Sequence, residues 1–283
     1  MGKLTPETLR QLQMKTLEMS KYFVEFCKRH DITCYFCGGG CIGAIRHRGF
    51  IPWDDDLDFF IPRPDYERLK KLWVEEEHDS LELIFPSEDY NDHNIFMTLR
   101  DKNTTQIKPY QQSLDINHGV AIDIFPIDGA PSSKVKRSFQ LFWALVYQIY
   151  CAQLVPTNYG KLVTYMGKIL LKLVPSKTIK YQIWHFAEQQ MSKYHFDDCD
   201  MITELCAGPR YMRNLYPKKA FEDSIFVEFE GAEMPIPKGY DVYLRIAFGN
   251  YMTLPPTEQQ QSHHDAIFLD LNKSYIHYKG IYY

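Results

Sequence analysis

Four aspartates stand close together in a segment that is otherwise apolar and rich in glycine. The segment "CGGGCIGAIRHRGFIPWDDDLDFFIP" spans residues 37–62, and its acidic side chains are Asp54, Asp55, Asp56 and Asp58. Carboxylates this close repel one another, and apolar neighbours such as Trp53 and Phe59 make the charge costly to bury. A chain can fold around such a cluster when a cation compensates the charge.

The pattern predicts a strand over residues 53–61, on which alternate side chains share a face. Asp54, Asp56 and Asp58 then point to one side, and Asp55 points to the other. Mg²⁺ prefers oxygen ligands and usually keeps waters and substrate phosphates in its shell. We therefore expect this strand to hold Mg²⁺, with Mn²⁺ as the alternative ion.

A second acidic strand is expected at residues 120–127, "VAIDIFPI", where Pro126 should end it. Its Asp123 has no basic neighbour in the sequence, and a lone buried carboxylate is costly unless it is paired or bound to a metal. If the two strands are neighbours, Asp56, Asp58 and Asp123 form one site. We predict these three as catalytic and metal-binding residues, suited to displacement at phosphorus.

The glycines predict a phosphate site beside the carboxylates. A strand over residues 31–37 is expected to end at the glycine triplet, and a helix is expected over residues 41–48. Such a turn collects backbone N–H groups and a helix N-terminus, which favour phosphate. The expected substrate-binding residues are Gly39, Gly40, Arg46, His47 and Asp54.

Two other readings of the same residues are weaker. An EF-hand loop also begins with alternating aspartates, but its sixth position requires glycine and here holds Phe59. Cys34, Cys37 and Cys41 resemble a zinc or iron–sulfur spacing, but no matching second pair follows. We expect these cysteines to be buried free thiols.

The order of elements predicts an α+β fold with a mixed β-sheet core flanked by helices. Helices are expected over residues 5–30 and 64–77, with short strands over 82–86 and 95–100. Thr5 can cap the N-terminus of the first helix, and Pro6 and Glu7 are favourable residues for its first turn.

The charge changes sharply in the middle of the chain. Residues 129–187 contain no Asp or Glu and eight basic residues, whereas the whole chain has a net charge of -4. We divide the chain accordingly into a catalytic core, residues 1–128, a basic helical insertion, residues 129–187, and a C-terminal part that completes the core, residues 188–283. A basic surface of this kind points to an anionic partner.

Residues 138–160 carry no charge and raise the question of a transmembrane helix. Recurring glutamines and Pro156 argue against a span. In residues 161–174, Lys161, Lys168 and Lys172 are expected near one face with aliphatic residues opposite, which is typical of a helix lying in a membrane surface. The alternative is an ordinary basic surface on a helical subdomain.

The overall composition limits the class of partner and the cellular compartment that we expect. The acidic net charge argues against a nucleic-acid binder. Seven cysteines, an odd number, do not suggest a disulfide framework, and the polar N-terminal residues do not resemble a signal peptide. We expect a cytoplasmic protein, peripheral at the inner face of the cell membrane.

The segment from residue 38 to residue 69 resembles the signature of the LicD family of phosphocholine transferases. The family pattern runs Gly-Gly-Thr-Leu-Leu-Gly-x-x-Arg-His and then Ile-Pro-Trp-Asp-Asp-Asp-Ile-Asp, against "GGGCIGAIRHRG" and "IPWDDDLD" here. Two later stretches, "AIDIFPIDGAP" and "YLRIAFGNYMTLPP", are also similar to the family. One departure is that Gly40 and Cys41 replace the usual Thr-Leu.

The resemblance implies a nucleotidyltransferase-like fold shared with fukutin-type phosphosugar transferases. It implies transfer of phosphocholine from CDP-choline to a hydroxyl of a cell-surface glycan or a teichoic-acid precursor, with release of CMP. The expected acceptor partner is a lipid-linked glycan or a teichoic-acid precursor. By position, Gly39 and Gly40 fall on the glycine turn, Asp56 and Asp58 on the metal-binding pair, and Asp123 on the third carboxylate. An anionic membrane surface is the expected setting of the acceptor.

Overall fold

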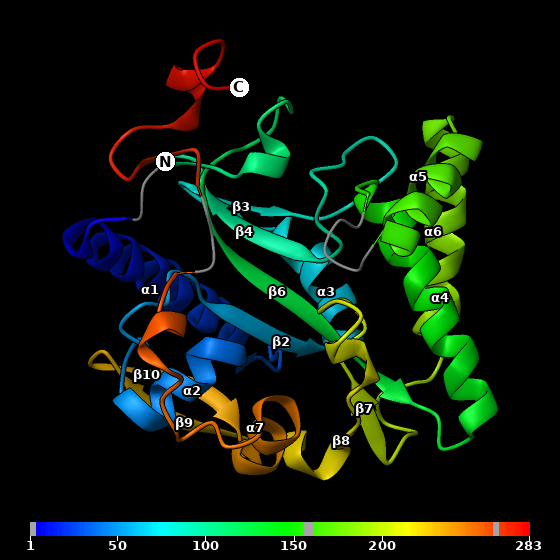
Figure 1. The fold of residues 1–283 in the computed structure, drawn as a ribbon. Coiled ribbons are helices and arrows are strands. Elements are labelled where there is room, and N and C mark those ends of the chain that lie inside the picture. The colour runs from blue at the N-terminus through cyan, green and yellow to red at the C-terminus, as the bar shows by residue number, and fades with distance from the viewer. Residues whose placement is uncertain (1–3, 156–160, 263–265) are drawn as a thin grey trace.

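The computed structural model describes residues 4–155, 161–262 and 266–283, which fold around one mixed β-sheet (Figure 1). Its strands lie in the order β1, β2, β6, β4 and β3, and β7 and β8 extend it from the far end of β6. Their bounds are β1 Tyr35–Phe36, β2 Asp58–Pro62, β3 Leu81–Ile84, β4 Met97–Asp101, β6 Val120–Ala130, β7 Met201–Thr203 and β8 Tyr216–Pro217. The β2–β6 pair is parallel, and the other pairs are antiparallel.

Helices flank this sheet, which confirms the predicted mixed sheet with helices around it. Their bounds are α1 Pro6–Arg29, α2 Gly38–His47, α3 Arg63–Trp73, α4 Lys134–Ala152, α5 Lys161–Leu173, α6 Lys177–Met191 and α7 Tyr240–Phe248. Two small antiparallel pairs complete the regular structure: β5 Thr105–Ile107 with β11 Phe268–Asp270, and β9 Ser224–Phe229 with β10 Ala232–Pro237. The first helix is as predicted, since the Thr5 side chain accepts a hydrogen bond from the Thr8 N–H at 3.1 Å.

Several predicted boundaries are wrong. The strand expected over residues 31–37 is only two residues long, and the helix expected over residues 64–77 ends at Trp73. The first acidic strand begins at Asp58, so residues 53–57 form an irregular approach to it and strict alternation does not apply there. The glycine triplet does not precede its helix but forms the first turn of α2. Pro126 does not end β6. It lies between the part of β6 paired with β4, which ends at Ile124, and the part paired with β7, which begins at Asp128, so its missing N–H does not interrupt either ladder.

Buried side chains form two clusters. The larger packs the sheet against α1, α2, α3 and α7, and the smaller lies between α4, α6 and residues 205–212. Figure 1 shows α4, α5 and α6 gathered at one side of the sheet, away from α1 and α2. The guanidinium of Arg63 joins the two parts, because it pairs with buried Asp128 of β6 at 2.8 Å and with Glu188 of α6 at 3.1 Å. The proposed division into domains stays a prediction.

The uncharged stretch predicted not to cross a membrane is mostly helix α4. In the parts of the chain that the structure describes, no helix is both long enough and apolar enough to span a bilayer. Residues 156–160, the end of that stretch, lie outside the described residues.

The cysteines predicted as buried free thiols are found so. Cys34, Cys37 and Cys41 are each buried and unbridged. Burial, helped by the nearby Asp58 carboxylate, raises the pKa of the Cys37 thiol well above its usual value, so this thiol is protonated at neutral pH.

Candidate active site

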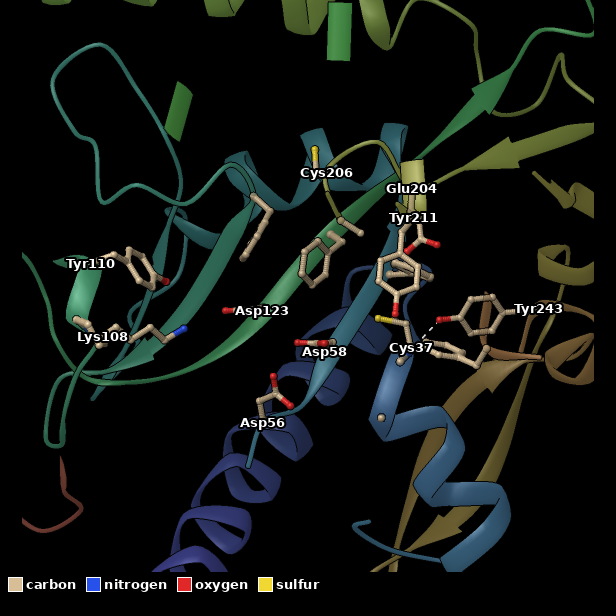
Figure 2. Close-up of a pocket in the computed structure, with 18 residues that line it drawn as sticks. Cys37, Asp56, Asp58, Lys108, Tyr110, Asp123, Glu204, Cys206, Tyr211 and Tyr243 are labelled. Atoms are coloured by element: carbon tan, nitrogen blue, oxygen red, sulfur yellow. Dashed lines mark hydrogen bonds between the residues drawn. The ribbon is translucent and has the colours of Figure 1, made fainter. Parts of the chain in front are cut away.

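A cavity of about 690 Å³ opens where the N-terminus of α2, the strands β2 and β6, and residues 204–211 come together (Figure 2). It collects charged side chains from segments that are far apart in the sequence. These are Asp56, Asp58, Lys108, Asp123 and Glu204. Aromatic rings make up much of the remaining wall, and the cavity is therefore shaped for a ligand with both charged and apolar parts.

The two acidic strands are neighbours, which is the condition on which the predicted three-carboxylate site depends. Asp58 of β2 lies directly opposite Asp123 of β6 in the parallel register. Asp56 reaches the same cavity from the irregular residues just before β2 (Figure 2). The Oδ1 atom of Asp123 is buried and accepts no hydrogen bond from the described residues. Such an oxygen can accept a bond from a ligand or ligate a cation.

Asp54 and Asp55 do not line the cavity. Asp55 is buried, and its carboxylate accepts a hydrogen bond from the Ser262 hydroxyl at 2.6 Å. Asp54, Asp55 and Asp56 nevertheless offer carboxylate oxygens that lie within 4.8 Å of one another. The prediction that Asp55 points away from its neighbours is therefore not supported. Asp56 belongs both to this cluster and to the group of aspartates that lines the cavity.

The start of α2 forms one wall of the cavity through Cys37, Gly38 and Gly39. Gly38 has a φ of +52°, which a side chain would strain, and its N–H donates to the Tyr243 hydroxyl at 2.9 Å. A Cβ on Gly39 would lie 2.0 Å from the Oδ2 atom of Asp54. Glycine is thus what lets the Asp54 carboxylate approach the positive end of the helix.

The other predicted substrate-binding residues lie outside this wall. Gly40 packs against Phe36 and Leu57. The guanidinium of Arg46 donates to the Tyr251 carbonyl at 2.6 Å and to the Nε2 atom of His47 at 2.9 Å. None of Gly40, Arg46 and His47 lines the cavity, and their contact with substrate stays a prediction.

Lys108 is a cavity residue that the sequence does not reveal. It precedes a short 3₁₀ turn, Pro109–Gln111, and faces the cavity (Figure 2). Burial, the largest single effect, lowers the pKa of its amine, but Asp123, Tyr110 and Asp56 together raise it by more, and the net pKa lies above the usual value. Lys108 is therefore a fixed positive charge on the wall, in a segment without any recognisable motif.

Glu204 is the second residue that the sequence does not reveal. Its side chain is buried, and it accepts a hydrogen bond from the Tyr216 hydroxyl, which in turn accepts one from the Asn214 amide at 2.9 Å. Burial raises the pKa of this carboxyl to about 7, although the bonds from Tyr216 and Asn214 oppose the shift.

This pKa predicts how stability changes with pH. Glu204 binds its proton more tightly in the folded chain than in the unfolded chain, so its contribution falls as pH rises from about 4.5 to about 7. Glu204→Gln removes this titration and keeps an acceptor for Tyr216. We expect the free energy of unfolding of the variant, relative to the unsubstituted chain, to rise by about 3 kcal/mol between pH 5 and pH 8. Urea unfolding at the two pH values measures this, and an equal difference at both would contradict the shifted pKa.

Two comparisons with known proteins agree with one another. Residues 31–147 match the family model described as "LicD/FKTN/FKRP, nucleotidyltransferase domain". The chain is also 29% identical over 266 residues to the lipopolysaccharide cholinephosphotransferase LicD of Haemophilus influenzae, covering 91% of this chain and 96% of the relative. The matched segment contains the glycine turn and all the aspartates described above. The resemblance to the LicD family that was predicted from the sequence is thereby confirmed, over residues 31–147 by the family model and over most of the chain by the relative.

Proposed function

We propose that the protein transfers phosphocholine from CDP-choline to a hydroxyl of a lipid-linked glycan or a teichoic-acid precursor, on a nucleotidyltransferase-like fold, and releases CMP. The observation that carries the proposal is the cavity itself, which brings the first turn of α2, three aspartates and Lys108 to one place. The named activity of the relative, cholinephosphotransferase, supports the choice of the transferred group.

The donor set fits Mg²⁺ or Mn²⁺. Asp56, Asp58 and Asp123 offer oxygens on one wall of the cavity, and the Oδ1 atom of Asp123 is buried without a hydrogen bond from the described residues. These three residues would hold the ion. Once bound, it would supply positive charge that neutralises the diphosphate and the charge developing on CMP. The group of Asp54, Asp55 and Asp56 is a poorer candidate, because only Asp56 of the three reaches the cavity.

The side chains and backbone groups of the cavity would bind the substrate and accept the proton. Lys108 and the N-terminus of α2 bind the diphosphate and orient the phosphorus that carries choline. The acceptor hydroxyl attacks that phosphorus, its proton passes to the carboxylate of Asp123, and the bond from phosphorus to the CMP oxygen breaks. The products are a phosphodiester of choline and the glycan, and CMP.

Two alternatives use different features of the chain. The same fold can act on another CDP-linked alcohol or on a sugar phosphate. In that case the carboxylates of the cavity would have the same role, and only the donor substrate would differ. A non-catalytic, membrane-bound scaffold would not need charged groups gathered in a cavity. The presence of Asp56, Asp58 and Asp123 together on its wall favours an enzyme.

The carboxylates provide the first test. Asp56→Asn and Asp58→Asn should each lower CMP release from CDP-choline by at least about 100-fold. Their melting temperatures should be unchanged or higher, because repulsion between carboxylates is relieved. Asp89→Asn, at an exposed position outside the cavity, is the matched control. Full activity in both cavity variants would contradict the assignment, and no CMP release from CDP-choline by the unsubstituted chain would remove this donor.

The glycine turn provides a second test. Gly39→Ala must displace the Asp54 carboxylate, so we expect a loss of activity on the order of 100-fold with no loss of thermal stability. Gly40→Ala is a matched control in the same helical turn, because its Cβ would meet Leu57 and Phe36 at an ordinary distance of 3.4 Å. Equal activity in the two variants would contradict a role for the Asp54 contact.

The helical segment supports binding to an anionic membrane. Large apolar side chains on the outer faces of α4, α5 and α6 are exposed: Val135, Phe139, Phe142, Leu145, Tyr165, Ile169, Leu173, Ile179 and Phe186. Exposed lysines accompany them: Lys134, Lys136, Lys168, Lys172 and Lys177. The predicted separation of lysines from apolar residues on α5 is wrong in part, since Tyr165 and Ile169 share the exposed face with Lys168 and Lys172. Mixed faces of this kind suit the region between headgroups and acyl chains.

One basic residue of the segment does not belong to this surface. Arg137 is buried, and its guanidinium donates to Gln140 at 2.6 Å, to Thr203 at 2.9 Å and to the Met212 carbonyl at 2.5 Å. Burial lowers its pKa to about 10. Arg137 therefore stabilises the packing of α4 on the sheet, and the exposed lysines carry the surface charge.

Vesicle binding tests the membrane surface. Lys168→Gln with Lys172→Gln should weaken binding to vesicles containing phosphatidylserine by about 30-fold, at about 1 kcal/mol for each lysine, and added salt should reduce the difference. The pair Lys21→Gln and Lys71→Gln, exposed on α1 and α3, is the matched control. Binding that is equally strong on neutral vesicles would contradict the proposal.

A further inference from the structure

The two ends of the cavity differ in charge. Lys108 and Tyr110 lie at one end in Figure 2, Glu204, Tyr211 and Tyr243 lie at the other, and the carboxylates lie between them. The electrostatic contacts agree with this view. Asp123 is the carboxylate that acts most strongly on the charge of Lys108, whereas Asp58 and then Glu204 act most strongly on Cys37, and Asp56 acts on both. An elongated ligand would therefore meet a cation at one end and an acid at the other.

Aromatic rings surround the acidic end. The rings of Tyr211 and Phe248 have centroids 5.8 Å apart, and those of Tyr243 and Phe248 have centroids 6.4 Å apart. All three rings line the cavity. Tyr243 is 1% exposed and is fixed by the N–H of Gly38. The guanidinium of Arg210 lies over the Tyr211 ring at 5.5 Å, but Arg210 does not line the cavity. It therefore does not occupy the space in which a ligand would contact this ring.

Glu204 completes this end of the cavity. Its side chain is 5% exposed, and within the described parts of the chain it forms no ion pair. Tyr216 donates to it and fixes its position. A buried carboxylate held in this way, without a cation of the protein, is costly unless a ligand supplies the charge. The raised pKa of Glu204 reports that cost.

We propose that Glu204, Tyr211, Tyr243 and Phe248 form the binding site for the quaternary ammonium group of the donor, while Lys108 and Tyr110 face its nucleotide end. A quaternary ammonium has no N–H to donate, so aromatic faces and a nearby carboxylate are the groups that can recognise it. Lys108 would repel the same cation at the opposite end. This assignment rests on the proposed use of CDP-choline, and it selects four residues from 20 tyrosines, 18 phenylalanines and the many acids of the chain.

Calorimetric titration of the full chain with CDP-choline and, separately, with CMP tests the assignment in the presence of Mg²⁺. Tyr211→Leu should weaken CDP-choline binding by about tenfold and leave CMP binding within about twofold. Glu204→Gln should do the same, and Tyr211→Phe should restore the affinity of the unsubstituted chain. Unchanged CMP binding also shows that each variant is folded.

Tyr110→Leu is the matched control at the other end of the cavity, where the loss should be similar for CDP-choline and CMP. An equal loss for both ligands in Tyr211→Leu would overturn the assignment, because the aromatic end would then hold the nucleotide. No loss for either ligand in Tyr211→Leu and Glu204→Gln would also overturn it. If the unsubstituted chain binds CMP but not CDP-choline, the proposed donor is wrong, and the assignment of the ammonium site is wrong as well.

Discussion

The parallel pairing of β2 with β6 is the constraint on which the site depends. Its register places Asp58 against Asp123, although 64 sequence positions separate them. Both strands are buried in the larger apolar cluster, so neither can shift by one residue without turning its buried side chains to the wrong face. The apolar residues around the aspartates thus hold two like charges at a fixed separation, a cost that is reasonable where a cation is part of the working protein.

The rest of the cavity is built around that pair by segments of very different kinds. The first turn of α2 brings backbone donors, the residues after β5 bring Lys108, and residues 204–211 bring an acid and an aromatic ring. The helical segment packs on residues 205–212 through the smaller cluster, and Arg63 links it to β6 and to α6. A surface that binds a membrane through α4 to α6 would therefore be mechanically connected to the cavity wall that carries Glu204 and Tyr211.

The sequence predicts the centre of this site better than its ends. Asp56, Asp58 and Asp123 could be identified because charge inside an apolar strand is an unusual local pattern. Gly39 could be identified from its place in a glycine triplet. The reason why glycine is needed there, the close approach of the Asp54 carboxylate, is visible only in the tertiary structure. Lys108 and Glu204 could not be found, since each stands in an ordinary segment and becomes significant only through distant neighbours. The start of β2 at Asp58 could not be predicted, because alternation of side chains does not show where backbone pairing begins.

A crystal structure of the protein soaked with CDP-choline and Mg²⁺ would locate the metal and the diphosphate together. We expect the metal on the carboxylates of Asp56, Asp58 and Asp123, with the diphosphate between Lys108 and the first turn of α2. A metal bound by Asp54, Asp55 and Asp56 alone, or a diphosphate bound outside the cavity, would contradict this expectation.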